Sequence, residues 1–170
     1  MLSGNIRSRR ILIPPDVTPD HVLGLAEVLY SLGGSIDPMY VGDAIGENIR
    51  ILPHAIDLAE ALDIIRHSGG VITLTEFGKS IVRGNNKVVR RLLRETALRL
   101  EPLREIVRRL KNRGSIPVEE YDEIIRENYP SEDHERAFKN ILIWGAFLKI
   151  FRMNEEDSSL IPIDIDIKDL

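Results

Sequence analysis

Residues 53–79 read PHAIDLAEALDIIRHSGGVITLTEFGK, and this stretch joins a helical pattern to a strand pattern. Apolar residues recur at the three- and four-residue spacing of one helix face, which predicts a helix over residues 53–67. A Gly69-Gly70 break follows, and residues 71–75 then alternate apolar and hydroxyl side chains as a strand does. A helix that runs into a short β-ribbon is typical of the end of a winged-helix unit.

The same order of patterns recurs in the second half of the chain. A helical pattern over Asp133–Lys149 runs into the strand-like Ile150–Met153 and an acidic turn at Asn154–Ser158. We therefore expect a mainly α fold with short β-ribbons, built as tandem winged-helix-like units joined by a helical arm. The expected boundaries are 1–84 for the first unit, 85–114 for a basic helical connector, and 115–170 for the second unit with a C-terminal strand over Ile161–Ile167. Such a scaffold carries no chemistry of its own.

Composition limits the class of protein. The chain has 170 residues, of which 43% are hydrophobic, and this is enough apolar material for a real core. It has no cysteine, so disulfides, thiolate zinc sites and thiol nucleophiles are excluded. No apolar run approaches the roughly 20 residues of a membrane helix, and no apolar segment of a signal peptide follows the polar start. We expect a soluble, cytoplasmic protein without membrane insertion.

The net charge of −4 conceals a strong partition along the chain. Residues 76–114 carry 12 Lys and Arg against 4 Asp and Glu, whereas residues 115–170 carry 6 against 14. A basic middle flanked by acidic ends either neutralises itself within the chain or contacts an acidic partner.

No arrangement of residues predicts catalysis. Gly78-Lys79-Ser80 lies between a strand and a helix, as in a phosphate-binding loop, but the earlier glycine that such a loop needs is replaced by Thr73. Glu76 would also repel a phosphate. None of the four histidines lies at metal-ligand spacing from another ligand, and no serine-nucleophile motif occurs. We expect no enzyme activity, no metal site and no cofactor.

The first candidate binding surface is the apolar helical segment over residues 141–148. It is apolar nearly all round, so it is either buried on both sides or half of a protein interface. The pattern leaves open whether its two aromatic residues are core or interface. The candidate interface residues are Ile143, Trp144 and Phe147.

The second candidate surface is a cationic cluster in the basic middle of the chain, made of Arg83, Lys87, Arg90, Arg91 and Arg94. A further cluster lies between Arg104 and Arg113. Solvation or pairing with the acidic second unit is the first interpretation, an acidic protein partner the second, and nucleic acid the third. Nucleic acid is disfavoured because the stretch has no aromatic residue on which bases could stack. The helix over residues 53–67 also directs acidic residues outward.

Short motifs in a fixed order connect the chain with a known family. They are Pro15-Asp16-Val17, Val22-Leu23-Gly24-Leu25 with Glu27, Leu32-Gly33-Gly34, Leu74-Thr75-Glu76-Phe77-Gly78 and Trp144-Gly145-Ala146-Phe147. With these motifs the chain resembles the AAA-associated C-terminal domain, which is appended to the ATPases of nitrate/sulfonate/bicarbonate-type ABC importers and also occurs as a stand-alone protein. The resemblance implies a regulatory or interaction module with no catalytic residues. The given sequence contains no nucleotide-binding cassette, so we expect the ATPase to be a separate chain.

Two functions follow as hypotheses. The leading one is a non-enzymatic regulatory or protein-interaction module whose partner is an ABC-type ATPase or a second copy of the same chain. The alternative is a winged-helix DNA-binding transcriptional regulator that uses its wing and its basic arm. The sequence leaves the identity of the partner, the oligomeric state and any effector ligand open.

Overall fold

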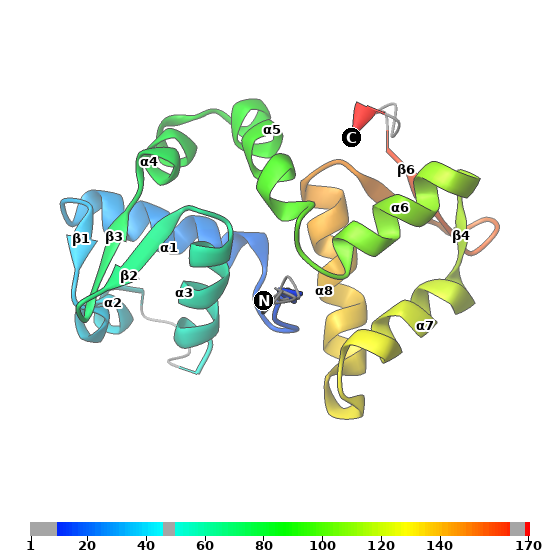
Figure 1. Ribbon diagram of the computed structural model, residues 1–170, viewed down its shortest axis with the longest axis horizontal. Coiled ribbons are helices and arrows are strands. Elements are labelled where there is room, and N and C mark those ends of the chain that lie inside the picture. Colours follow the sequence, from blue (N-terminus) through cyan, green and yellow to red (C-terminus); the bar gives the residue numbers. More distant parts are fainter. Residues whose placement is uncertain (1–9, 46–49, 164–168) are drawn as a thin grey trace, which may run out of the picture.

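The computed structural model describes residues 10–45, 50–163 and 169–170, and its helices and strands gather into two lobes (Figure 1). We call the left lobe the first unit and the right lobe the second unit. The first unit consists of α1 (Pro19–Ser31), β1 (Ser35–Ile36), α2 (Pro38–Ile45), α3 (Leu52–Ala61), β2 (Ile65–Ser68) and β3 (Val71–Leu74). The connecting helices are α4 (Glu76–Arg83) and α5 (Asn86–Ala97). The second unit consists of α6 (Leu103–Arg113), β4 (Ile116–Pro117), α7 (Val118–Asn128), the 3-10 turn η1 (Ser131–Asp133), α8 (His134–Phe147), β5 (Phe151–Asn154) and β6 (Ser159–Pro162).

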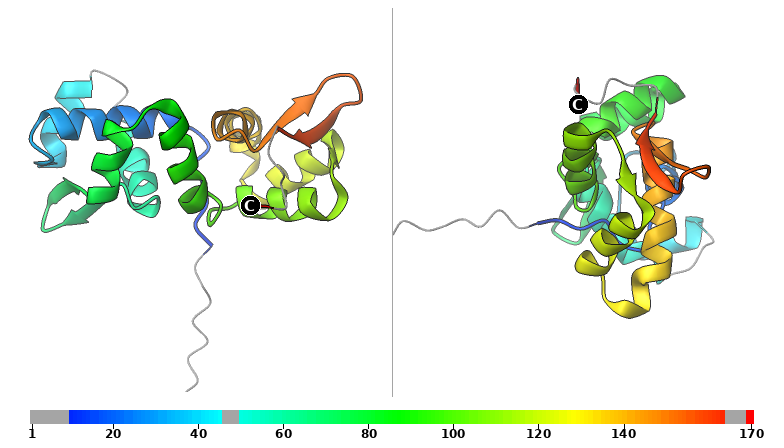
Figure 2. Two further views of the ribbon diagram at one scale, coloured as in Figure 1. Left: turned by 90° about the horizontal axis from the view of Figure 1, so that it is seen from above. Right: turned by 90° about the vertical axis from the view of Figure 1, so that its right-hand side faces the viewer.

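Both units have the same order of elements: a helix, a short strand, two helices and a two-stranded hairpin. Their three-stranded antiparallel sheets also have the same strand order, β1-β3-β2 in the first unit and β4-β6-β5 in the second. The second hairpin extends away from the end of its unit (Figure 2). The expectation of a mainly α protein with short β-ribbons is confirmed.

The helix expected over residues 53–67 is too long, because α3 ends at Ala61. Asp63 has a φ of 63°, in the left-handed region, and the Ile64 N–H donates to the Ala59 carbonyl, which closes the helix. Ile64 and Ile65 are almost completely buried as the chain enters β2. Ile65 matches the helical spacing of α3 by coincidence, and this match extended the prediction into the strand.

The second long helix is also shorter than expected. It begins at His134, after η1, and ends at Phe147. Lys149 adopts a φ of 53°, and the Ile150 N–H donates to the Gly145 carbonyl, so the chain turns directly into β5. The expected C-terminal strand over Ile161–Ile167 is described only at its start, where β6 covers Ser159–Pro162. Residues 164–168 lie outside the described residues.

Glycine is required at two positions by close packing. A Cβ added at Gly145 would lie 2.2 Å from the ring of Phe151, and one at Gly78 would lie 2.2 Å from the Ile64 carbonyl oxygen. In both places a helix approaches the entrance of a strand of its own hairpin. Gly78 of the Gly78-Lys79-Ser80 sequence, which resembles part of a phosphate-binding loop, is therefore explained by the close approach of α4 to the start of β2.

The segment Ile11–Val17, which we call the strap, precedes α1 and lies against the second unit. Its backbone is bound by buried side chains of that unit: the Tyr129 hydroxyl donates to the Ile13 carbonyl at 2.6 Å, and the Trp144 Nε1–H donates to the Val17 carbonyl at 2.9 Å. Asn140 Nδ2 donates to the Val17 carbonyl as well, at 2.9 Å. The strap therefore ties the start of α1 to α7 and α8.

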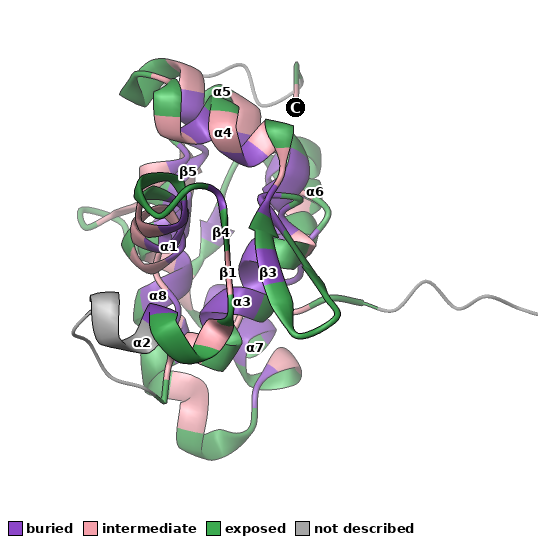
Figure 3. Ribbon diagram, turned by 90° about the vertical axis from the view of Figure 1, so that its left-hand side faces the viewer, coloured by how far each residue is buried: buried purple, intermediate pink, exposed green. Residues whose placement is uncertain are grey.

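Burial is continuous from the first unit to the second. The strap residues Ile13 and Val17 are fully buried, and they belong to one apolar cluster that includes residues of both units. On the outer side of the first unit the turn between β2 and β3 is exposed, whereas α3 and β3 direct buried positions inward (Figure 3).

Gly145→Ala should lower the free energy of unfolding by about 2 kcal/mol, because the added methyl group overlaps the buried ring of Phe151. Gly24→Ala is the matched control, since nothing lies within 4 Å of a Cβ at this helical position. It should raise stability by up to about 1 kcal/mol through helix propensity. Urea denaturation measures both changes, and an equally stable Gly145→Ala variant would contradict the packing argument.

Tyr129→Phe should lower the free energy of unfolding by about 1–2 kcal/mol, because it leaves the buried Ile13 carbonyl of the strap without its hydroxyl donor. Burial raises the pKa of the Tyr129 phenol, so the group stays a donor over the ordinary pH range. Tyr40→Phe removes the same atom from a side chain that is 59% exposed and should change stability by less than about 0.5 kcal/mol. If both variants change the free energy of unfolding by the same amount in urea denaturation, the hydrogen bond from Tyr129 to the strap does not contribute to stability.

Candidate functional site

The structure brings the two candidate sets of residues together where α5 meets the end of α8 (Figure 1). The Arg94 Nε–H donates to the Leu148 carbonyl at 2.6 Å, and the Arg90 guanidinium lies 5.9 Å from the ring centre of Phe147. Leu148 is the C-cap of α8, where helix carbonyls have no partner within the helix. We call this region, formed by α5 and the exposed side of α8, the α5–α8 surface.

The local sequence explains how α5 presents its cations. The helix begins at the N-cap Asn85, whose side chain accepts from the Val88 N–H at 3.0 Å. A buried stripe of Val89, Leu93 and Ala97 holds the helix in place. Arg90 and Arg94 flank this stripe one turn apart and are half-buried, whereas Lys87 and Arg91 are exposed.

Within the described residues, Arg90 and Arg94 contact the Phe147 ring and the Leu148 carbonyl and form no ion pair. Among the described residues, no carboxylate forms an ion pair with Arg90 or Arg94, and the Nε of Arg90 is buried without a hydrogen-bond partner. Burial, together with the neighbouring Arg90, lowers the pKa of Arg94, although an arginine remains charged at neutral pH. Two partly desolvated like charges are costly to keep together without an anion.

Trp144 is corrected from candidate interface to core. It is only 1% exposed, and its indole N–H binds the strap, so it cannot touch a partner directly. Ile143 is 47% exposed and Phe147 is half-buried. Together with the exposed Ala146 they form an apolar strip on α8, because residues three and four apart share a helix face.

Arg83 does not belong to this surface. Its Nε–H donates to the Tyr30 hydroxyl at 3.2 Å, and its guanidinium lies 5.6 Å from the centre of the Tyr30 ring. This hydrogen bond raises the pKa of Arg83. Arg83 therefore contributes to the contact between α4 and α1, and the sequence cluster of five cations is divided between two places.

Arg108, Arg109 and Arg113 of α6 pair with carboxylates of the same chain. Glu105 accepts from Arg108 at 2.6 Å and from Arg109 at 2.7 Å, and Glu120 of α7 pairs with Arg109 and Arg113. These arginines lower the pKa of Glu105 to about 2. Self-neutralisation thus applies to α6 and not to α5.

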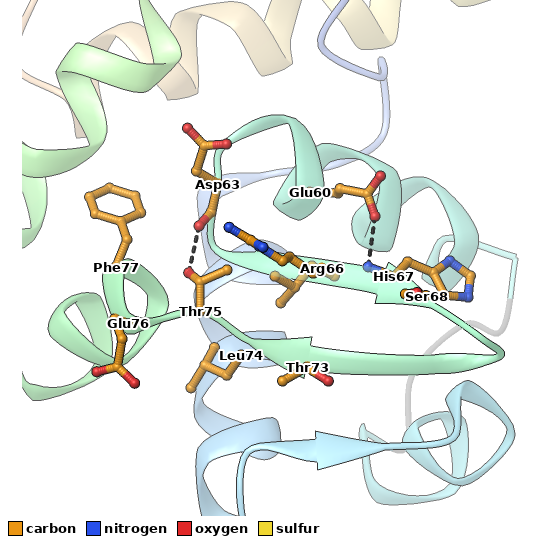
Figure 4. Close-up of a pocket in the computed structure, with 11 residues that line it drawn as sticks. Glu60, Asp63, Arg66, His67, Ser68, Thr73, Leu74, Thr75, Glu76 and Phe77 are labelled. Carbon is orange, nitrogen blue, oxygen red and sulfur yellow. Dashed lines mark hydrogen bonds between the residues drawn. The ribbon is translucent and has the colours of Figure 1, made fainter.

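A hollow of about 900 Å³ lies beside the hairpin of the first unit, and no sequence pattern predicts it (Figure 4). Its lining includes Glu60, Asp63, Arg66, Thr75 and Phe77, with Phe77 on the far side of the opening from Arg66. These residues come from α3, β2 and the start of α4, so only the folded hairpin brings them together.

Most polar groups of this hollow already have structural partners. The Thr75 side chain caps α4 by accepting from the Gly78 N–H, and its hydroxyl lies 2.6 Å from the Asp63 carbonyl. The Glu60 carboxylate accepts from the His67 N–H of the edge strand β2 at 2.9 Å, which protects that edge from further pairing. The hollow is therefore a weaker candidate site than the α5–α8 surface.

Within residues 10–45, 50–163 and 169–170, no three His, Asp or Glu side chains are grouped so that they could hold a metal ion. In the same part of the chain no helix has the length and apolar character needed to cross a membrane.

The described chain is thus a mainly helical protein with two small antiparallel sheets and a mixed cationic and apolar surface. The family of C-terminal AAA-associated domains matches residues 39–154, most of the chain, and the protein belongs to this family. The matched range contains both α5 and α8, and it confirms the resemblance. The motifs over residues 15–34 precede it. No curated protein and no solved structure gives a significant match to the chain.

Glu105→Gln should lower the free energy of unfolding near neutral pH by about 1 kcal/mol, the scale of a well-paired surface carboxylate. The pKa of Glu105 falls from 4.5 to about 2 on folding, so its contribution is complete above the unfolded pKa and is lost as the pH falls through about 2. The difference from wild type in urea denaturation should therefore shrink as the buffer is acidified.

Glu95→Gln is the control, because Glu95 is exposed and forms no ion pair within the described residues. The free energy of unfolding of Glu95→Gln should equal that of wild type within about 0.5 kcal/mol. A Glu105→Gln penalty that stays constant down to acid pH would contradict the assigned ion pairs.

Proposed function

We propose that the protein is a non-enzymatic regulatory module that binds a partner protein, an ATPase carried on a separate chain. Its membership of the C-terminal AAA-associated domain family supports the association with an ATPase. The observation that carries the proposal is the α5–α8 surface, where uncompensated arginines border the exposed apolar strip of α8. Exposed apolar groups next to unpaired charges are features of protein interfaces.

The scaffold for this role is a tandem pair of winged-helix-like units. The element order and the central position of the last strand in each sheet support this assignment. The proposed division is 1–84, 85–114 and 115–170. The position of α6 directly before β4, like that of α1 before β1, favours starting the second unit within the connector, at Leu103.

The DNA-binding alternative has less support. In the first unit the third helix, α3, directs Asp57 and Glu60 to the solvent, where they would repel phosphates. In the second unit the third helix, α8, uses Asn140 and Trp144 to bind the strap. Neither helix offers the cationic face that enters a major groove.

The test is crosslinking and affinity capture from extracts of the source cells, with the captured proteins identified by mass spectrometry. Wild type should enrich an ATPase subunit, and Ile143→Asp should reduce that enrichment about fivefold or more, because it places a charge in the apolar strip. Ile11→Asp is the matched control, since Ile11 and Ile143 are both 47% exposed.

Absence of any ATPase from the wild-type capture would contradict the proposed function. Equal capture by Ile143→Asp and wild type would instead reject the surface and leave the function standing. Circular dichroism and thermal unfolding establish that each variant is folded.

A further inference from the structure

The partner of the α5–α8 surface can be deduced from what the surface lacks. Arg90 and Arg94 lie one turn apart, and both are fixed by contacts with α8 rather than by carboxylates of the described chain. The buried Arg90 Nε has no acceptor among the described residues. Lys87 and Arg91 extend the positive charge along the exposed side of α5 and have no ion pair in the same part of the chain. An anionic group of a partner would pair with these cations.

The anion must suit an apolar neighbour. The Arg90 guanidinium lies 5.9 Å from the ring centre of Phe147, and Ile143 lies one helical turn before Phe147. The exposed Lys149 follows this strip, whereas Lys139 before it is paired with Glu135. An apolar strip with cations around it fits a ligand that carries acidic groups beside an apolar side chain.

We infer that the α5–α8 surface binds an acidic amphipathic segment of a partner protein, whose carboxylates pair with Arg90 and Arg94 and whose apolar side chains cover Ile143 and Phe147. This inference rests on the proposed function and names the chemistry of its partner. Glutamates one turn apart on a partner helix would match the one-turn spacing of the arginines on α5. The occupant is a protein segment and not a nucleic acid.

Two observations favour carboxylates on a protein over the phosphates of a nucleic acid. Single strands bind by stacking bases on aromatic faces, but Arg90 already covers one face of the half-buried Phe147. A duplex backbone offers phosphates and sugars, which would leave the exposed Ile143 uncovered.

The test uses fluorescence anisotropy with a labelled synthetic peptide of about 16 residues, long enough to form a helix, with glutamates on one face and leucines on the other. The full-length protein should bind it, and higher salt should weaken binding. A scrambled peptide of the same composition and a peptide with lysine in place of glutamate are the ligand controls. A random DNA duplex is measured in parallel.

Arg90→Glu should weaken peptide binding about tenfold, since it replaces an attractive contact by a repulsive one. Lys87→Glu, at an exposed position, should weaken binding about threefold and keeps the test valid if Arg90→Glu disturbs the contact between α5 and α8. Arg66→Glu is the matched control, because Arg66 is exposed and lies on the hairpin of the first unit. It should change binding by less than about twofold.

Three results would overturn the inference. The protein does not bind the amphipathic peptide, or it binds the scrambled peptide with the same affinity. The third is that Arg66→Glu weakens peptide binding as much as Arg90→Glu does. Binding of the duplex that is steep in salt and lost in Arg90→Glu, without peptide binding, would assign the surface to nucleic acid. If the protein does not bind the peptide but Ile143→Asp reduces ATPase capture, the proposed function stands. Only the acidic character of the partner is then rejected.

Discussion

The buried carbonyl of Val17 is the point on which the arrangement of the two units depends. It accepts hydrogen bonds from Asn140 Nδ2 and Trp144 Nε1, both at 2.9 Å, so two donors of α8 converge on one backbone oxygen. A buried carbonyl without such donors would cost a large part of the stability of a small protein. Val17 directly precedes Thr18, the N-cap of α1, so this bond pair fixes the start of α1 against α8.

The strap also decides which face of α8 remains available. One side of the helix lies on the core of its own unit through Ile141 and Trp144, and Asn140 is occupied by the strap. The strip around Ile143 stays at the surface, and the end of this strip lies beside α5. The same contacts that join the units therefore bury Asn140 and Trp144 and leave Ile143 exposed on the other side of α8.

Local patterns predict the elements of this fold, and long-range contacts decide the site. Helix α7 covers Val118–Asn128, and Pro117 and Pro130 bound it in the sequence. The role of Trp144 depends on a strap 127 residues away, and an all-round apolar helix gives no indication of such a partner. In the same way, spacing alone groups Arg83 with Arg90, although folding places Arg83 on Tyr30 and Arg90 on Phe147.

The contrast between α5 and α6 follows from the acids within reach of each helix. On α6, Glu105 lies three and four residues before Arg108 and Arg109, and α7 adds Glu120. On α5 the single acid, Glu95, forms no ion pair within the described residues. Half-burial makes the unpaired charge of Arg90 and Arg94 more expensive than it would be in open solvent. Carboxylates supplied by a partner would offset that cost, so binding at this surface would stabilise the protein.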